Sequence, residues 1–345
     1  MTTLASPKRL GFFTRLLDQT SAAERYWLAT QQIMHAERCG FDSAWIAQHH
    51  FHEGEGGLPS PFVFLAHVAV QTSRIRLGTG IVTLPLELPV RVAEDAVVTD
   101  LMSNYRLEVG VGPGGNLTAF TAFGLDANDR HKLVNGNLEL MRTAWGGGTL
   151  PGGDKLYPSS PTLVDRIWQA TFSVEGARRA GLAGDGLMLS RTQPRSPDAP
   201  KATLADIQNP MIDAYLSALP KGCQPRILAS RTVFIADDAK EAMRLAEIGA
   251  ARMRHRLAAT GNLSSGSLVG DLITAFDVHI GMPEQVTASL QADETLARAT
   301  DLTMQVHSID PPHPFILRSI ELMAEKVAPA LGWAPSDNAA ARRVA

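Results

Sequence analysis

The residues best suited to proton transfer form one short cluster, residues 48–53 (QHHFHE). A histidine side chain has an ordinary pKa of roughly 6.5, so it can give or take a proton near neutral pH. Because side chains alternate along an extended strand, His49 and His50 point to opposite faces, and at most one of them enters a shared site. With Glu53 and Glu55 nearby, the histidines could bind a metal ion. Alternatively, they could serve only to hold the loop backbone. The spacing matches no strong metal-binding signature, so we expect no metal.

Two glycine-bearing stretches could let a flat ligand approach the backbone. Residues 110–115 (GVGPGG) have the spacing G-x-G-x-x-G. A dinucleotide-binding fold needs that motif after its first strand, whereas here it follows the fourth, and Pro113 lacks a backbone donor. Gly80 interrupts a regular strand, as glycine does at a bulge or at a close approach of a ligand. Plain packing against a bulky neighbour, or a tight turn, explains the same glycines without a ligand.

Ser173 lies at the expected start of a helix, directly after the fifth strand. The free N–H groups and the dipole of a helix N-terminus attract phosphate. A serine that only caps the helix is an equal alternative. The sequence contains no G-x-S-x-G, C-x-x-C or P-loop motif, so no standard nucleophile or nucleotide signature competes with these two interpretations.

Strands and helices must alternate along the chain to position these residues. Eight short apolar stretches are expected as strands: 9–14, 43–48, 75–84, 106–111, 166–171, 186–190, 226–236 and 301–306. Most are followed by a helical pattern, which favours a single (β/α)8 TIM barrel over an open sheet. We expect the barrel domain at 1–335 and a disordered tail at 336–345. Three irregular segments are expected as insertions on the C-terminal face, above the site: 146–161, 191–225 and 260–281.

Composition narrows the class of protein. The chain has 345 residues, 45% hydrophobic, and a net charge of −3. That composition excludes a disordered chain, and the lack of a clustered basic excess excludes a nucleic-acid binder. Two cysteines, Cys39 and Cys223, exclude a disulfide scaffold and fit a reducing compartment. With no secretion signal and no apolar run of roughly 18 residues, we expect a cytoplasmic protein with no membrane span.

Several stretches together resemble the flavin-dependent luciferase-like monooxygenases. The matching segments are residues 39–51, 75–114, the turn that contains Ser173, and 279–286. Their order and spacing agree with the family over most of the chain, and residues 146–225 resemble it least. The sequence is more similar to the FMN-dependent branch than to luciferase proper.

The resemblance implies an enzyme that uses reduced FMN and O2 to oxidise a small organic substrate through a peroxyflavin. It assigns the acid/base role to His49. It places Gly80 and Ile81, a pair that the family often joins by a cis peptide, under the flavin ring. The other residues that it assigns to the cofactor are Gly112, Ser173, Val174 and Ser190. Those that it assigns to the substrate pocket are Phe13, His50 and Arg231, the last because sulfonate-oxidising members place an arginine in that strand.

Other implications concern partners, departures and alternatives. The family resemblance implies a separate flavin reductase, a homodimer, and a water-excluding lid at 260–281. Pro113 stands where luciferase has a phosphate-binding arginine, so the phosphate is expected to depend on Ser173 or on another arginine such as Arg191. Two alternatives remain open. One is an F420-dependent hydride-transfer oxidoreductase of the same superfamily, and the other is a non-catalytic flavin-binding barrel.

Overall fold

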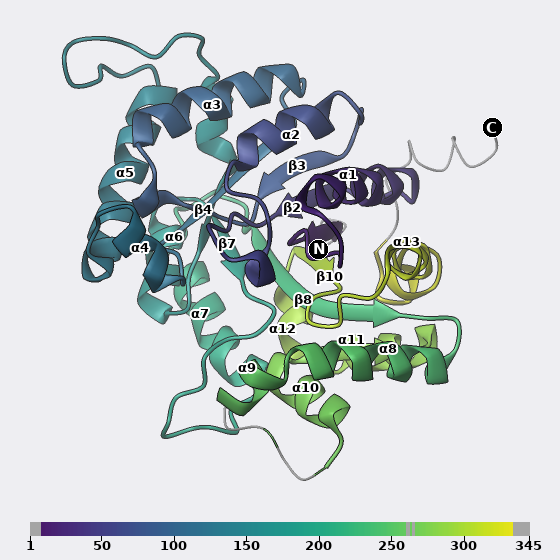
Figure 1. Ribbon diagram of the computed structural model, residues 1–345. Coiled ribbons are helices and arrows are strands. Elements are labelled where there is room, and N and C mark those ends of the chain that lie inside the picture. Colours follow the sequence, from purple (N-terminus) through teal and green to yellow (C-terminus); the bar gives the residue numbers. More distant parts are fainter. Residues whose placement is uncertain (1–7, 260–262, 264–265, 334–345) are drawn as a thin grey trace, which may run out of the picture.

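A closed parallel barrel forms the centre of the molecule, surrounded by helices (Figure 1). The computed structural model describes residues 8–259, 263 and 266–333. The barrel strands follow one another in the order β1-β2-β3-β5-β6-β7-β8-β10, all parallel, and β10 pairs with both β8 and β1 to close the ring. The predicted (β/α)8 barrel is therefore confirmed. The predicted tail, 336–345, lies outside the described residues.

Ten strands and the helices between them have the following bounds. The strands are β1 (Arg9–Thr14), β2 (Ser43–Ile46), β3 (Arg76–Thr79), β4 (Val82–Thr83), β5 (Leu107–Gly112), β6 (Ile167–Ala170), β7 (Gly186–Leu189), β8 (Ile227–Ile235), β9 (Val278–Gly281) and β10 (Asp301–Gln305). The helices are α1 (Ala22–Arg38), α2 (Pro61–Ala69), α3 (Pro89–Met102), α4 (Leu117–Ala122), α5 (Arg130–Trp145), α6 (Val174–Leu182), α7 (Leu204–Ala218), α8 (Ala239–Arg252), α9 (Arg254–Ala259), α10 (Leu268–Phe276), α11 (Pro283–Gln291), α12 (Glu294–Arg298), α13 (His313–Leu322) and α14 (Ala328–Ala330).

Two tryptophans fill the middle of the barrel. The rings of Trp45 and Trp168 meet edge to face, with centroids 5.6 Å apart. Each ring lies on a glycine of a neighbouring strand: a Cβ at Gly78 would stand 2.2 Å from Trp45, and a Cβ at Gly186 would stand 2.2 Å from Trp168. No side chain fits at those two positions, since core atoms are already close-packed. The barrel is thus a packed core, and a ligand can bind only at one of its ends.

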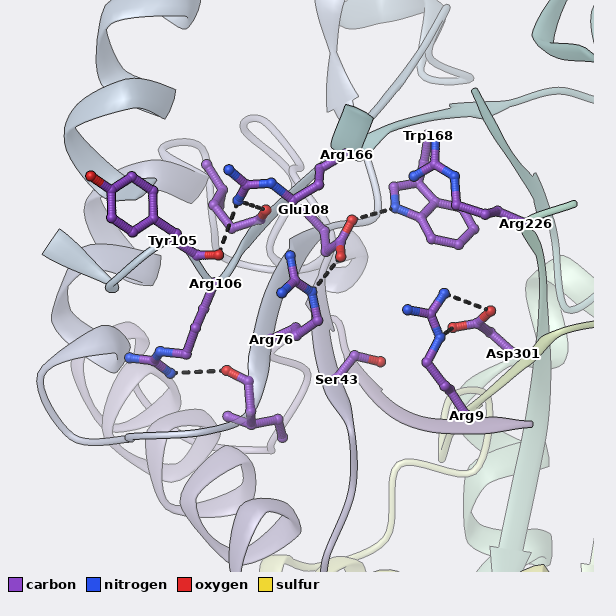
Figure 2. Close-up of polar contacts among 12 residues, drawn as sticks. Arg9, Ser43, Arg76, Tyr105, Arg106, Glu108, Arg166, Trp168, Arg226 and Asp301 are labelled. Carbon is purple, nitrogen blue, oxygen red and sulfur yellow. Dashed lines mark hydrogen bonds and ion pairs between the residues drawn. The ribbon is translucent and has the colours of Figure 1, made fainter. Parts of the chain in front are cut away.

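Polar side chains close the amino-terminal end of the barrel (Figure 2). Arg9 Nε lies 2.9 Å from Asp301 Oδ1, and Arg76 forms an ion pair with Glu108. The indole of Trp168 donates to the second oxygen of Glu108 over 2.8 Å. Because these charged groups bind one another, this end serves stability, and the carboxyl ends of the strands are left to form a site.

The third strand, which was expected over residues 75–84, breaks at Gly80 in the structure. β3 ends at Thr79, the Gly80–Ile81 peptide is cis, and β4 resumes at Val82. Across the break, Thr79 Oγ1 donates to the carbonyl of Gly110 (2.8 Å) and accepts from its N–H (2.9 Å). A side chain therefore replaces ladder hydrogen bonds where the backbone turns out of the sheet.

One of the three predicted insertions lies at the wrong end for a site. Residues 146–161 connect α5 to β6, so they lie at the amino-terminal end of the barrel, where Ser160 Oγ donates to Asp100 over 2.6 Å. A loop that enters a barrel strand is always opposite the loops that leave one, so the prediction of a C-terminal-face insertion was wrong for this segment. The segment 191–225 does follow a strand, β7, and contains α7. The described part of 260–281 adds α10 and the unpredicted strand β9.

Strand β9 extends the sheet beside the long strand β8, pairing with its last residues. Helix α8 returns over the end of β10, where Arg252 Nη2 donates to the carbonyl of Ile309 over 2.6 Å. Helices α8 to α10 therefore cover one side of the carboxyl-terminal face (Figure 1). Within the described ranges, no helix has both the length and the apolar character that a membrane span requires.

Candidate active site

Four of the predicted residues form an apolar floor at the carboxyl ends of the strands. A Cβ at Gly80 would stand 2.5 Å from the Phe13 ring, so the ring packs directly on that glycine. A Cβ at Gly112 would stand 2.5 Å from Ile81 Cδ1. Ile81 and Phe13 also pack against the cluster around the two barrel tryptophans. The missing side chains of the two glycines therefore let neighbouring strands present one continuous surface.

The first histidine of the predicted pair lies at the rim of this floor. The preceding N–H, of Gln48, donates to the carbonyl of Ile81 over 3.4 Å, which ties the end of β2 to the floor. His49 Nε2 lies 3.0 Å from Arg15 Nη2. A guanidinium can only donate, so Nε2 accepts and the ring proton of the neutral imidazole is on Nδ1. The nearest acidic group, Glu55 Oε2, is 3.8 Å from Nδ1, too far for a direct hydrogen bond.

Burial keeps His49 neutral. Loss of solvent, and after it the positive charge of Arg15, together lower the pKa of His49 to about 3. The same cause lowers the pKa of His307 to about 4. His307 Nδ1 lies 2.7 Å from Asp310 Oδ2, while its Nε2 is buried with no hydrogen-bond partner among the described residues. At neutral pH both rings are uncharged, and each presents a nitrogen lone pair through Nε2.

Two arginines stand beside these histidines without a carboxylate partner. Arg15 Nη2 also lies 3.0 Å from the carbonyl of Glu55, and its Nε is buried and unpaired. Arg191, only 6% exposed, donates to Thr232 Oγ1 over 3.0 Å, and its guanidinium carbon lies 5.3 Å from the centre of the Phe276 ring. Across the described chain, neither guanidinium has a carboxylate oxygen within 4.0 Å. Burial lowers the pKa of Arg15 to about 10 and that of Arg191 to about 9.

A small cavity opens beside Arg15. Its lining includes Phe13, Gln305, His307 and Asp310. Gln305 Oε1, His307 Nε2 and Arg15 Nε are buried and have no hydrogen-bond partner among the residues that the structure describes. Buried polar atoms are almost always hydrogen-bonded, so these three atoms mark a place where a ligand or water binds.

The predicted phosphate site is on the other side of the floor. Ser173 Oγ accepts from the N–H of Gly176 over 3.1 Å and so caps α6. The first-turn N–H groups of Val174 and the next residue have no intrahelical acceptor and face an exposed surface. Ser190, which ends β7, is half-buried, and its carbonyl accepts from Gln208 Nε2 over 2.8 Å. The cap itself does not distinguish a structural serine from a phosphate ligand, but the free N–H groups fit an anion.

His50, the second histidine of the pair, packs against aromatic rings. The His50 ring packs edge-on against Phe123, with ring centres 5.0 Å apart, and tilts against Phe51. Burial lowers its pKa as well. Of the two histidines, His49 contacts Arg15 and His50 contacts Phe123, and a contact between His50 and substrate stays a prediction. No group of three or more His, Cys, Asp or Glu side chains in the described part of the chain is arranged to hold a metal ion.

Comparison with known proteins decides the family. The sequence model of the luciferase-like monooxygenases matches residues 11–300. The chain belongs to the luciferase-like monooxygenase family. A curated relative, limonene 1,2-monooxygenase of Rhodococcus erythropolis, is 31% identical over 178 residues, 47% of this chain and 44% of that protein. The chain thus spans less than half the length of this curated relative, and the family resemblance is confirmed.

Solved structures of luciferase-like proteins share the barrel. An FMN complex of the oxygenating constituent of 3,6-diketocamphane monooxygenase from Pseudomonas putida has a TM-score of 0.72 and 21% identity, covering 94% of this chain and 98% of that one. A coenzyme F420-dependent tetrahydromethanopterin reductase from Methanopyrus kandleri has a TM-score of 0.67 and 19% identity, covering 94% and 99%. At these identities the likeness establishes the fold and leaves the cofactor open.

Arg231, which was predicted to contact the substrate, lies outside the site at the carboxyl ends of the strands. Arg231 is completely buried on the outer side of β8, with Nε 2.5 Å from Asp293 Oδ2 and Nη2 3.0 Å from Gln208 Oε1. Its neighbours Ser230 and Thr232 point inward instead, to Gln305 and Arg191. Strand alternation turns Arg231 toward α7 and α12, so the prediction of a substrate contact for Arg231 was wrong.

The most highly charged part of the site, formed by Arg15, His307 and Asp310, was not predicted from the sequence. Arg15 directly follows β1, and His307 and Asp310 follow β10. A usable signal was present, because polar residues just beyond the carboxyl end of a barrel strand point to the catalytic face. Arg191 was considered only as a substitute ligand for the flavin phosphate, and its contact with Thr232 shows that it points toward β8.

Proposed function

We propose that this protein is a flavin-dependent monooxygenase that uses reduced FMN and O2 to oxidise a small organic substrate, with His49 as its acid/base group. The observation that carries the proposal is the position of a neutral His49 at the rim of the floor formed by Gly80, Ile81 and Gly112. Membership in a family of monooxygenases supports the reaction type.

The residues present fit a flavin. Ile81 and Gly112 offer a flat apolar surface without a projecting side chain at the glycine. The first turn of α6, at Ser173 and Val174, offers free N–H groups for a phosphate, and Ser190 lies at the end of the next strand. A bound reduced flavin would supply the electrons that activate O2. The floor and the tryptophan-filled barrel beneath it exclude water from that side.

His49 has a defined starting state for proton transfer. Its Nε2 lone pair is occupied by Arg15, while Nδ1–H has no acceptor within hydrogen-bond distance. The imidazole can take up a proton at Nε2 only after the guanidinium moves away or its charge is balanced. Either event raises the pKa of His49, since the nearest positive charge is among the causes that lower it.

Formation of an oxygenated product tests the reaction directly. We expect the purified protein, supplied with reduced FMN by an added flavin reductase, to increase the yield of an oxygenated product from a panel of aldehydes, ketones and terpenes. Reduced FMN that neither binds nor supports product formation with any member of the panel contradicts the proposal.

A histidine substitution separates an enzyme from a non-catalytic flavin-binding barrel. His49→Ala is expected to bind reduced FMN as the wild type does and to lose product formation by about 100-fold, the usual size of an acid/base contribution. His131→Ala, at an exposed position on α5, is the matched control and keeps full turnover. Unchanged turnover in His49→Ala removes the acid/base assignment.

An F420-dependent hydride-transfer enzyme is the second candidate, supported by the barrel shared with the F420-dependent reductase. Saturable binding of F420 with no binding of reduced FMN favours it over the monooxygenase. We further propose that a separate reductase supplies the reduced flavin and that the protein works as a homodimer. Turnover that depends on added reductase, and a mass of two chains by light scattering, are the corresponding expected results.

A further inference from the structure

We propose that the substrate of this site is an organic carboxylate whose charged group binds between Arg15 and Arg191, at the ends of β1, β8 and β10. This inference rests on the proposed function, because it takes the open end of the barrel as the place of reaction. It adds the chemical class of the substrate, which family membership alone does not determine.

The first support is the incomplete set of hydrogen bonds around Arg15. Its guanidinium donates to two neutral acceptors, His49 Nε2 and the carbonyl of Glu55, each over 3.0 Å. Its Nε is buried with no partner and lies beside the small cavity. A guanidinium held out of water without a counter-ion is costly, and hydrogen bonds that it donates to a carboxylate remove that cost.

The second support is Arg191, which meets the same description from another strand. It is buried, and its guanidinium contacts within the described part of the chain are the hydroxyl of Thr232 and the face of the Phe276 ring. Thr232 Oγ1 in turn donates to the carbonyl of His307 over 2.6 Å, so this guanidinium lies over β8 and β10. His307 also lines the cavity beside Arg15, so Thr232 and His307 connect the two guanidinium groups to one region. The charge of Arg15 lowers the pKa of Arg191 as well.

The position around the barrel separates this region from the flavin phosphate. The residues that fit the flavin belong to β4, β5, the start of α6 and the end of β7. Arg15 directly follows β1, across the ring of strands from β6, and Arg191, which comes directly after Ser190, turns its side chain to Thr232 on β8. An anion held by these arginines is therefore the second ligand and not the phosphate at Ser173.

The charges facing this region leave it positive. A third arginine, Arg256 on α9, contributes to the potential at both buried arginines. The acidic groups that oppose it are Asp310 and Glu55, while Asp277 forms an ion pair with Arg195. Three arginines therefore face two carboxylates that, among the described residues, have no ion pair with another arginine. His307 Nε2 is an acceptor and adds no attraction for an anion, so charge recognition depends on the two arginines. The molecule as a whole carries −3, so the positive mouth is a local feature.

A carboxylate suits this pair better than a neutral group. Its two oxygen atoms can accept from two guanidinium groups at once, and each such charge-assisted bond is roughly twice as strong as a neutral one. A carboxylate that accepts from Arg15 Nε also balances the positive charge beside His49. Binding of the substrate would then raise the pKa of His49, because the charge of Arg15 is one of the causes that lower it.

Binding of matched acids and amides tests the inference without any turnover. The probes are decanoate and benzoate, each compared with its primary amide, titrated into the flavin-free protein by calorimetry. We expect the acids to bind at least about tenfold more tightly than the amides, the effect of one charge-assisted hydrogen bond. Arg15→Gln and Arg191→Gln should each abolish the preference, and Arg15→Lys should retain part of it. Arg244→Gln, an exposed arginine on α8, removes the same charge elsewhere and should leave the preference unchanged.

A flavin arm of the same experiment identifies the source of the anion. Reduced FMN and reduced riboflavin, which lacks the phosphate, are titrated into the wild type and Arg15→Gln. Equal acid and amide affinities in the folded wild type overturn the proposal, as does loss of FMN but not riboflavin affinity in Arg15→Gln. Flavin binding without acid preference would leave the proposed function standing, whereas acid preference without flavin binding would remove the function and leave an anion site.

Discussion

At the scale of single residues, the contact between Arg15 and His49 determines the protonation state of the site. Arg15→Gln is expected to raise the pKa of His49, although it stays below the ordinary value because burial is the largest cause of the shift. Nitrogen chemical shifts of the imidazole, followed by NMR from about pH 8 to 4, measure the change. The wild-type ring should remain neutral throughout, with the proton on Nδ1. A wild-type ring that titrates near pH 6.5 contradicts this contact.

Buried neutral histidines also make stability depend on pH. The pKa values of His49, His307 and His279 are lowered by burial to about 3, 4 and 4. Above about pH 6.5 these rings are neutral in both folded and unfolded chains and carry no penalty. As the pH falls below about 6.5 only the unfolded chain takes up protons, so the free energy of unfolding drops by up to ~1.4 kcal/mol per pH unit for each histidine.

Urea unfolding at about pH 7.5, 6 and 5 checks that slope. The buried carboxyls of Asp185 and Asp301, whose pKa values burial raises, act in the opposite direction at the acid end, so the upper part of the range is decisive. His307→Gln should reduce the slope. A free energy of unfolding that is constant or rises toward pH 5 would show that these histidines are not buried in the neutral form.

At the scale of elements, the barrel depends on glycines that accept the tryptophan rings. Gly78→Ala places a Cβ 2.2 Å from Trp45, so either the ring or the strand must move. Overpacking of this kind costs about 1–3 kcal/mol of unfolding free energy. Gly270→Ala, on the exposed side of α10 where a Cβ meets nothing within 4 Å, is the control and should stabilise by a few tenths to ~1 kcal/mol. Equal unfolding midpoints for the two variants in urea would contradict the packing argument.

The sequence predicted all eight barrel strands to within a few residues, because apolar runs and the helices after them follow the local chain. What could not be predicted depends on tertiary direction. The interruption at Gly80 was anticipated, but the hydrogen bonds between Thr79 and Gly110 on β5, which replace the ladder there, were not. The segment 146–161 was placed on the wrong face because composition alone does not tell a loop that enters a strand from one that leaves it.

The same limit applies to the site. His49, Gly80 and Ile81 were identified through a family resemblance that covers contiguous segments. Arg15 could not be identified in this way, since its contact with His49 joins two separate strand ends. Arg231 was misassigned for the opposite reason: it occupies a family position, but in this chain it faces Asp293 and the outer helices.

At the scale of the whole molecule, the chain has a net negative charge, whereas the proposed carboxylate site at Arg15 and Arg191 is locally positive. Charged groups near that site attract an anion through solvent, and dissolved salt screens this attraction. Raising the salt concentration from about 0.05 to 0.5 M should weaken binding of decanoate severalfold and leave decanamide unaffected. Calorimetry at both salt concentrations makes the comparison. An equal response of acid and amide would mean that the arginines contribute no net attraction.

Reduced FMN is expected to bind at the carboxyl-terminal face of this barrel and to react there with oxygen. An anaerobic titration with photoreduced FMN, repeated with reduced F420, tests this expectation most directly, with flavin fluorescence and the spectrum of the bound cofactor as readouts. We predict saturable binding of reduced FMN, no binding of F420, and faster oxidation of the bound flavin when O2 and a substrate are added together. Binding of F420 alone, or of neither cofactor, would contradict this expectation.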